Sequence, residues 1–195
     1  MKVFAFVDTH GNNTKIAALK EKAKKADILI CAGDLTMFED RLLEHLKTLN
    51  GIGPQVLLIH GNHEEEHTLR IACKPHEKLL NIHKGFFKKG ENVFLGYGGG
   101  GFSMVDLEFE QLEDKFKKHM QGKNTVLILH GPPYGTNLDK LDRGHVGNNS
   151  YTTFIRRHQP KLVICGHLHE NAGKKDKIGN SLVVNPGPDG MMFYI

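Results

Sequence analysis

Side chains that can bind metal ions stand directly after five short apolar segments of this sequence. Glycine lies in or beside each of these groups, which lets the backbone turn sharply and approach closely. The groups are Asp8-Thr9-His10, Gly33-Asp34, His60-Gly61-Asn62-His63-Glu64, His130-Gly131 and Gly166-His167-Leu168-His169. In open α/β sheets, ligands bind outside the carboxyl ends of the strands. If the five segments are such strands, their polar groups can face one point.

The residue types in these groups are typical of a site for transition-metal ions. Two aspartates, one asparagine and four histidines exceed the ligands that a single tetrahedral zinc needs. Mixed imidazole and carboxylate ligands suit Mn, Fe, Co, Ni or Zn, and so much imidazole disfavours calcium. Two dications about 3.5 Å apart repel each other by about 19 kcal/mol at an effective dielectric constant of about 20, which requires an anion between them. Asp34 is the candidate for that shared carboxylate, because its group contains no histidine.

Short apolar segments rich in β-branched and aromatic residues predict eight strands. They are Val3–Val7, Ile28–Ala32, Val56–Ile59, Val93–Leu95, Val126–Leu129, Leu162–Cys165, Leu182–Val184 and Met191–Ile195. Helical spacing of apolar residues predicts helices over Thr14–Lys25, 42–49, Phe109–Met120 and Tyr151–His158. Strands that alternate with helices indicate an α/β protein whose strands are mostly buried on both faces. Only Asn185–Gly190 separates the last two strands, so we expect those two to pair antiparallel.

Length and composition predict one domain over residues 1–195. A hydrophobic share of 39% is sufficient for a sizeable core. No apolar run approaches the ~20 residues of a membrane span, and the apolar run at the amino terminus is too short for a signal peptide. Cys31 and Cys165 lie in apolar runs and no CxxC occurs, so we expect free thiols in a reduced, cytoplasmic protein.

The charge of the chain does not favour a nucleic-acid partner. Lysine and arginine number 26 against 22 aspartates and glutamates, a net charge of +4, and only 5 of the 26 are arginines. Nucleic-acid readers concentrate arginine for bidentate contacts, whereas these lysine runs alternate with glutamate and alanine as solvated helix faces do. We therefore expect a small substrate rather than nucleic acid or a membrane. The sequence is compatible with a monomer or an oligomer.

In order and complete, the five groups resemble the motifs of the calcineurin-like metallophosphoesterase superfamily. The resemblance runs from residue 3 to about residue 189, and Leu35-Thr36 and Gly131-Pro132-Pro133 are similar to its small phosphodiesterase branch. It implies two facing mixed β-sheets flanked by α-helices, a four-layer α/β sandwich with a dinuclear site at the sheet ends. The ligands that it implies are Asp8, His10, Asp34 and His169 for one ion, and Asp34, Asn62, His130 and His167 for the other.

The same resemblance implies a phosphoesterase in which His63 faces the substrate. Four metal charges, less two carboxylates and a bridging hydroxide, leave about +1, which suits the monoanion of a phosphodiester. The expected nucleophile is the metal-bridging hydroxide. Histidine titrates near neutrality, so His63 is expected to orient the phosphate or protonate the leaving group, while Asn62 both ligates and orients.

Two departures from the superfamily bear on specificity. Its protein Ser/Thr phosphatases carry Asp and Arg three and four residues after the shared aspartate, where this chain has Met37 and Phe38. The missing Arg removes a bidentate clamp for a dianionic monoester, which favours a diester. The missing Asp would otherwise orient His63, and Glu39 or Glu64 is the expected substitute.

The polar segment Tyr134–Asn149 is expected to supply further substrate contacts, with Arg143 and His145 as candidates; the alternative is an ordinary surface loop. His60 is expected to pack beside the site, because the ligand set is already complete. The remaining histidines are expected at the surface: His45, His67, His76, His83, His119 and His158.

Three other functions stay open on the sequence alone. A phosphomonoesterase of the same fold differs only in substrate. A non-catalytic metal-binding interaction module is the second, and the presence of His63 counts against it. A nuclease of the superfamily is the third, but such enzymes usually add a domain that grips DNA, for which we expect no room in 195 residues.

Overall fold

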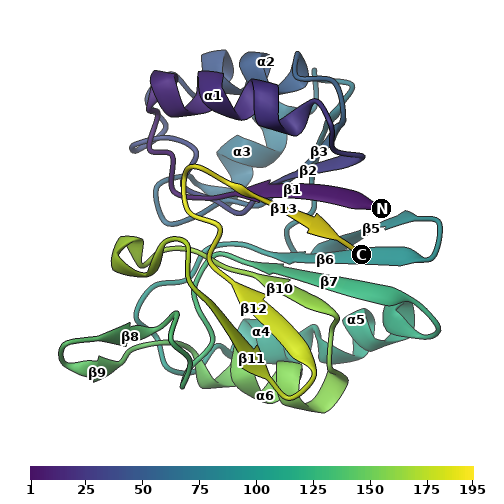
Figure 1. The fold of residues 1–195 in the computed structure, drawn as a ribbon, viewed down its shortest axis with the longest axis vertical. Coiled ribbons are helices and arrows are strands. Elements are labelled where there is room, and N and C mark those ends of the chain that lie inside the picture. The colour runs from purple at the N-terminus through teal and green to yellow at the C-terminus, as the bar shows by residue number, and fades with distance from the viewer.

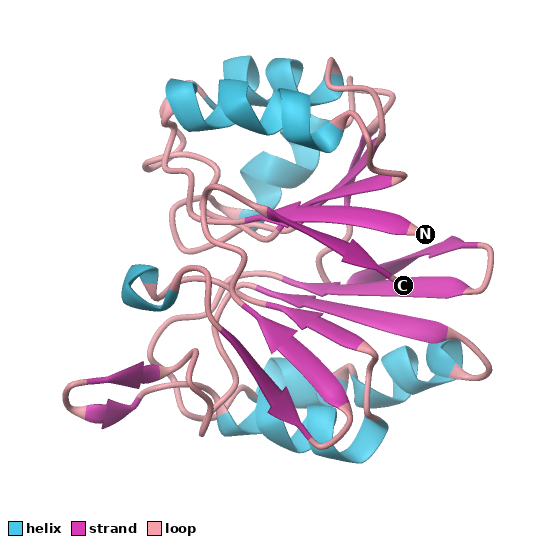
Figure 2. Ribbon diagram, viewed as in Figure 1, coloured by secondary structure: helices cyan, strands magenta, loops and turns pink.

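The computed structural model describes residues 1–195, which form two β-sheets that face each other (Figures 1 and 2). The first sheet contains, in spatial order, β13 (Met191–Tyr194), β1 (Lys2–Phe6), β2 (Ile28–Cys31), β3 (Gln55–Leu58) and β4 (Leu79–Asn81). Strands β1 to β4 are parallel, and β13 runs antiparallel to β1. Three helices cover the outer face: α1 (Asn13–Ala23), α2 (Leu42–Asn50) and α3 (Glu66–Cys73).

The second sheet is also mixed and carries its own helices. Its order is β11 (Lys175–Ile178), β12 (Ser181–Val184), β10 (Leu162–Ile164), β7 (Asn124–Leu129), β6 (Asn92–Tyr97) and β5 (Gly85–Lys89). The four inner strands are parallel, and β11 and β5 are antiparallel at the two edges. The helices on its outer side are α4 (Leu107–Gln111), α5 (Glu113–Met120) and α6 (Asn149–His158). A small hairpin of β8 (Lys140–Leu141) and β9 (Gly144–His145) projects from the body.

Alternating side chains along each strand fill three separate hydrophobic clusters. In β1, Val3 and Ala5 point into the cluster between the sheets, whereas Phe4 and Phe6 point toward the helices. This follows from the period of two in a strand. Residues such as Leu127 of β7 pack under the second set of helices. The result is helix, sheet, sheet, helix, which confirms the predicted four-layer α/β sandwich.

The expected pairing of the last two strands is wrong. Strand β12 pairs with β11 through a two-residue turn at Gly179 and Asn180, whereas β13 crosses to the other sheet and pairs with β1. The segment Asn185–Gly190 therefore connects the two sheets rather than two neighbouring strands. The physical reason is burial, because Phe193 of β13 reaches the cluster between the sheets. The predicted helix over Phe109–Met120 is likewise divided at Leu112 into α4 and α5.

The helices begin and end where local chemistry favours it. Asn12 caps α1 by accepting a hydrogen bond from the Lys15 backbone N–H, and Asn148 caps α6 in the same way. Helix α6 ends at His158, and Gln159 follows in the left-handed conformation directly before Pro160. None of the helices combines the length and apolar character needed to cross a lipid bilayer.

Candidate metal centre

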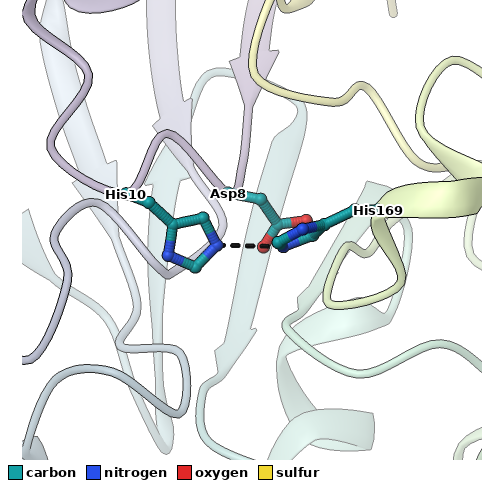
Figure 3. Close-up of side chains that lie close together, drawn as sticks. All are labelled: Asp8, His10 and His169. Carbon is teal, nitrogen blue, oxygen red and sulfur yellow. Dashed lines mark hydrogen bonds between the residues drawn. The ribbon is translucent and has the colours of Figure 1, made fainter.

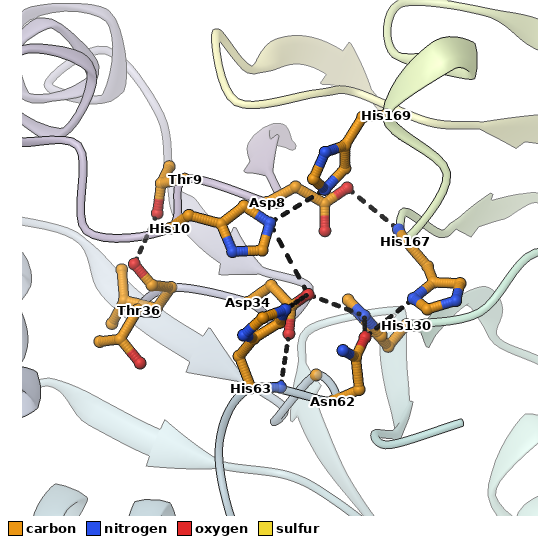
Figure 4. A network of polar contacts seen from close by, with 12 residues as sticks. Asp8, Thr9, His10, Asp34, Thr36, Asn62, His63, His130, His167 and His169 are labelled. Atoms are coloured by element: carbon orange, nitrogen blue, oxygen red, sulfur yellow. Dashed lines mark hydrogen bonds and ion pairs between the residues drawn. The ribbon is translucent and has the colours of Figure 1, made fainter. Parts of the chain in front are cut away.

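The five polar groups meet where β1, β2 and β3 of the first sheet and β7 and β10 of the second sheet end (Figure 4). Backbone hydrogen bonds align the loops within each sheet: Asp8 N–H donates to Gly33 C=O at 3.2 Å, and Gly166 N–H donates to His130 C=O at 2.7 Å. The Asp8 carboxylate then joins the two sheets, because its Oδ2 accepts the backbone N–H of His167 at 3.0 Å. The site therefore depends on contacts that both sheets contribute.

Four candidate ligands adopt left-handed backbone conformations. The φ angles are +57° at Asp8, +45° at His10, +49° at Asp34 and +69° at His167. Each such residue without the freedom of glycine costs roughly 1–2 kcal/mol, although Asp tolerates the region better than most. These sharp turns direct the side chains into the space between the strand ends, and strained backbone of this kind is concentrated at functional sites.

The first group of ligand atoms contains Asp8, His10 and His169 (Figure 3). The two imidazole Nε2 atoms lie 2.9 Å apart, and the rings meet at an interplanar angle of 62°. The Oδ1 atom of Asp8 is buried and has no hydrogen-bond partner. Two imidazole nitrogens and a carboxylate oxygen grouped in this way are donors that suit a borderline divalent ion.

The second group contains Asp34, Asn62, His130 and His167 (Figure 4). The Asn62 amide oxygen lies 2.8 Å from His167 Nδ1 and 3.1 Å from His130 Nε2. The Asp34 Oδ2 atom lies 3.5 Å from His130 Nε2. These residues also fit a divalent ion, since amide oxygen, carboxylate and neutral imidazole are all suitable donors.

Asp34 links the two groups through a single oxygen atom. Its Oδ2 lies 3.8 Å from His10 Nε2 and 3.9 Å from His63 Nε2, as well as 3.5 Å from His130 Nε2. The other oxygen, Oδ1, accepts the backbone N–H of His63 at 3.0 Å. The carboxylate is thus held by the backbone on one side and faces histidines of both groups on the other.

Asp34 and His130 shift each other's pKa values in opposite directions. Burial alone would raise the pKa of Asp34, but the hydrogen bond and charge of His130 outweigh it and lower that pKa to about 2. Burial would likewise lower the pKa of His130, and Asp34 outweighs it and raises that pKa. A metal ligand must be a neutral imidazole, so metal binding at His130 displaces a proton.

The pKa of Asp8 predicts that metal affinity falls in acid. Burial raises this pKa to about 6, while His130 acts to lower it and Asp34 to raise it further. A protonated carboxyl cannot bind a cation, so the carboxylate is available above pH 6 and is lost as the pH falls through 6. We expect the affinity for Mn²⁺ to fall about tenfold per pH unit below pH 6. Calorimetric titration at pH 7, 6 and 5 measures this, with circular dichroism to verify folding. An affinity that stays constant down to pH 5 would contradict the prediction.

Glycines make the close approach of the strand ends sterically feasible. A Cβ atom at Gly61 would clash with the Asp34 carboxylate and with the Asp34 backbone nitrogen. A Cβ at Gly33 would lie 2.6 Å from His130 Nδ1. Both positions therefore require glycine because a candidate ligand occupies the space that a side chain would take.

We expect Gly61→Ala to displace Asp34. The substitution should lower the free energy of unfolding by about 1–3 kcal/mol, as overpacking does, and weaken Mn²⁺ binding at the same time. Thermal unfolding and calorimetric titration measure the two effects. Gly51→Ala is the matched control, since a Cβ there has its nearest contact at 3.4 Å. Equal behaviour of the two variants would show that the crowding at Asp34 is not significant.

Comparison with known proteins shows which family has this arrangement. The model of the calcineurin-like phosphoesterase superfamily domain matches residues 1–193. An uncharacterized protein of Methanocaldococcus jannaschii is 32% identical over 207 residues, which covers 100% of this chain and 91% of that protein. The chain belongs to the calcineurin-like phosphoesterase superfamily.

Solved structures confirm the fold of this phosphoesterase. A protein of Thermus thermophilus superposes with a TM-score of 0.79 at 17% identity, covering 96% of this chain and 90% of that one. A dimetal phosphatase from Danio rerio gives a TM-score of 0.63 at 12% identity, covering 94% and 86%. At such low identity these neighbours show a common fold. The family implies divalent metal ions, and the clusters described above could bind them.

Neither glutamate expected to orient His63 of the phosphoesterase does so. Glu64 is buried and accepts the backbone N–H groups of Asp34, Thr36 and Gly61 at 2.8–3.1 Å, so it fixes the loop that carries Asp34. Burial nevertheless raises its pKa. Glu39 accepts the Glu65 backbone N–H instead. The anchoring role of Glu64 was missed, although its place directly after the Asn-His pair is a signal that could have indicated it.

The structure does not bring Arg143 and His145 of the phosphoesterase into the cluster. His145 Nδ1 lies 2.8 Å from Asp139 Oδ1, and that buried carboxylate also accepts the Gly135 and Gly147 backbone N–H groups. Arg143 lies in the turn of the β8–β9 hairpin and lines a surface pocket together with Glu170. His145 therefore supports its own loop, and a role of either residue in substrate binding stays a prediction.

The other histidines of the phosphoesterase divide into packed and exposed ones. His60 is buried against His83, with ring centroids 4.4 Å apart, as expected of a packed neighbour of the site. Burial lowers the pKa of both to about 4. The predicted surface positions are wrong for His83, whose side chain is buried, and for His45. His45 is 2% exposed and lies against Gly11. For His45 on α2, helical spacing alone does not reveal that a histidine replaces an apolar core residue, and His83 lies in the loop between β4 and β5.

Proposed function

We propose that this phosphoesterase is a phosphodiesterase that acts on a small substrate. It would use two divalent transition-metal ions, chosen from Mn, Ni, Fe, Co and Zn. The observation that carries the proposal is the Asp34 carboxylate, whose Oδ2 faces His10 of one group at 3.8 Å and His130 of the other at 3.5 Å. A carboxylate shared in this way reduces the repulsion between two cations. The dimetal phosphatase among its structural neighbours supports the same number of ions.

The seven proposed ligands fall into two sets that meet at Asp34. One ion would be held by Asp8, His10, Asp34 and His169, and the other by Asp34, Asn62, His130 and His167. When bound, divalent ions lower the pKa of the water that they coordinate and bind the phosphate oxygens. The chain supplies neutral imidazoles for this purpose: burial is the main cause that lowers the pKa of His167 to about 4, and it also lowers that of His10.

His63 is the group proposed to act on the substrate. Its Nε2 lies 3.9 Å from Asp34 Oδ2, its ring packs edge-on against His10 with centroids 4.7 Å apart, and its Nδ1 has no hydrogen-bond partner. The side chain is 17% exposed, so it lies at the rim of the cluster rather than beneath it. In its protonated form it can donate a hydrogen bond to a phosphate oxygen or a proton to the departing alkoxide.

The neutral rim next to Asp34 favours a diester. Met37 and Phe38 carry no charge where a clamp for a dianionic phosphate would require an arginine. A diester carries one negative charge fewer than a monoester at neutral pH, and its second organic substituent gains from contact with apolar side chains. Both features fit a rim of this composition.

Hydrolysis of chromogenic esters by the metal-depleted and reconstituted protein tests the proposal. Bis(p-nitrophenyl) phosphate should be hydrolysed only after addition of Mn²⁺, Ni²⁺ or a similar ion, and faster than p-nitrophenyl phosphate. Metal analysis should give two ions per chain. Metal binding without any ester hydrolysis would instead identify an interaction module.

A phosphomonoesterase is the second candidate, and one observation favours it. Lys15 lines a cavity of about 430 Å³ together with Asp8 and His169, and an ammonium group there could receive a terminal phosphate. Its Nζ also lies 3.7 Å from Asp189, which compensates the charge. A higher kcat/KM for the monoester than for the diester, lost in Lys15→Ala, would establish this alternative.

A further inference from the structure

Two exposed phenylalanine rings lie directly against histidines of the metal centre. Phe38 is 75% exposed, and its ring centroid lies 4.4 Å from that of His63. Phe102 is 65% exposed, and its ring centroid lies 5.1 Å from that of His167. Large apolar side chains that stay in water and surround a polar centre are typical of a binding surface.

The backbone holds both rings in place. Phe38 has a left-handed φ of +49°, a costly conformation for a bulky residue, and the next residue is tied down because its N–H donates to Thr36 Oγ1 at 3.2 Å. The Phe102 segment turns at Gly99 and Gly100, where φ is +76° and +102°. At Phe38 the strained backbone fixes the exposed ring, whereas the Phe102 segment depends on hydrogen bonds at its far end.

The start of α6 fixes the far end of the Phe102 segment. The Asn148 side-chain amide donates to Ser103 C=O at 2.9 Å, and the Asn149 backbone N–H donates to Met104 C=O at 2.8 Å. Phe102 thus follows the second sheet, whereas Phe38 follows the first. His63 and His167 each have a ring nitrogen within 4.8 Å of an Asp34 carboxylate oxygen, so both phenylalanine rings stand one histidine away from the shared carboxylate.

We propose that Phe38 and Phe102 form a two-sided clamp for flat organic groups, so that the preferred substrates are phosphodiesters with an aromatic or nucleobase-like ring on each side of the phosphorus. This inference rests on the proposed function. The recognition is stacking and apolar contact, which tolerates any ring with a π face. Phe38 packs on His63, the proposed proton donor, and therefore lies on the side of the leaving group. Phe102 lies on the side of the group that stays on the phosphate.

Two esters with the same leaving group separate the two rings. Bis(p-nitrophenyl) phosphate has a ring on each side, whereas methyl p-nitrophenyl phosphate keeps only the leaving ring. With the Mn²⁺-loaded full chain, Phe102→Ala should lower kcat/KM about tenfold for the bis-aryl ester and at most twofold for the methyl ester. Phe38→Ala should lower kcat/KM about tenfold for both. Leu43→Ala on α2, where the side chain is 67% exposed, is the control and should change neither.

Binding of phosphonates tests the clamp without catalysis. Calorimetry on the Mn²⁺-loaded protein should show phenylphosphonate bound about tenfold more tightly than methylphosphonate, and the Phe38→Ala/Phe102→Ala double variant should lose that difference. Equal binding of both phosphonates by the unmodified protein would overturn the inference. A double variant that changes its oligomeric state but keeps the preference for phenylphosphonate would also overturn it. If the preference exists but no ester is hydrolysed, the proposed function fails and the clamp stands. If esters are hydrolysed and the variants behave like the control, the clamp fails alone.

Discussion

Asp34→Asn is expected to lower kcat/KM for a chromogenic phosphodiester by at least about 1000-fold and Mn²⁺ affinity by at least about 100-fold. The amide keeps the shape of the side chain but removes the charge that faces His10 and His130. Without this charge, the repulsion between two cations is no longer reduced. Loss of even a residue that only hydrogen-bonds to a metal ligand lowers metal affinity or activity about 10–100-fold. Metal analysis after dialysis and steady-state kinetics measure the two effects.

The control for this variant is Asp114→Asn, which changes an exposed carboxylate on α5 and should leave both quantities unchanged. The free energy of unfolding serves as a second check, because Asp34 Oδ1 also accepts the His63 backbone N–H. An Asp34→Asn protein that still binds two ions per chain with the original affinity would remove the shared carboxylate from the proposal.

His63→Ala is expected to lower kcat by about 100- to 10,000-fold while the bound metal stays unchanged. The range is that of a positioned general acid or base. The His63 Nε2 atom lies 3.9 Å from Asp34 Oδ2, and His63 belongs to neither proposed ligand set. Steady-state kinetics on the bis-aryl ester and metal analysis of the same preparation distinguish catalysis from metal binding.

An ester with a better leaving group sharpens the test of His63. If His63 protonates the departing alkoxide, the defect should shrink as the leaving group becomes more acidic, since less protonation is then needed. A defect of constant size would assign His63 to orienting the phosphate instead. His67→Ala on α3 is the matched control. Unchanged turnover in His63→Ala would exclude both roles.

The sequence indicated which polar side chains converge, because each candidate ligand lies within a few residues of a buried strand; metal binding by these residues stays a prediction. Once parallel strands are recognised, their carboxyl ends share an edge, and the side chains that follow must approach one another. His10 and His130 meet around Asp34 for this reason, although 120 residues separate them. Local sequence and the topology of parallel sheets are sufficient for this prediction.

Features that depend on contacts between distant segments could not be predicted in this way. Strand β13 joins β1 rather than β12, a choice made by burial between the sheets and not by any local signal. Strand β11 was missed because Lys175, Asp176 and Lys177 give it the charged composition of an edge strand. Phe102 was not singled out, because only the folded chain shows that its ring reaches His167.

The left-handed turns at Asp8, His10, Asp34 and His167 have a consequence for how firmly the cluster keeps its shape. This backbone deformation is offset when the chain folds, because the folded chain itself gives the four residues these φ angles. In return, the donor atoms keep fixed spacings, because neighbouring residues already hold the chain in its unfavourable conformation. Glycine at these four points would relieve the deformation and let the coordination shell rearrange. Phosphoryl transfer requires reacting atoms at set separations, and a cluster of fixed shape favours such chemistry.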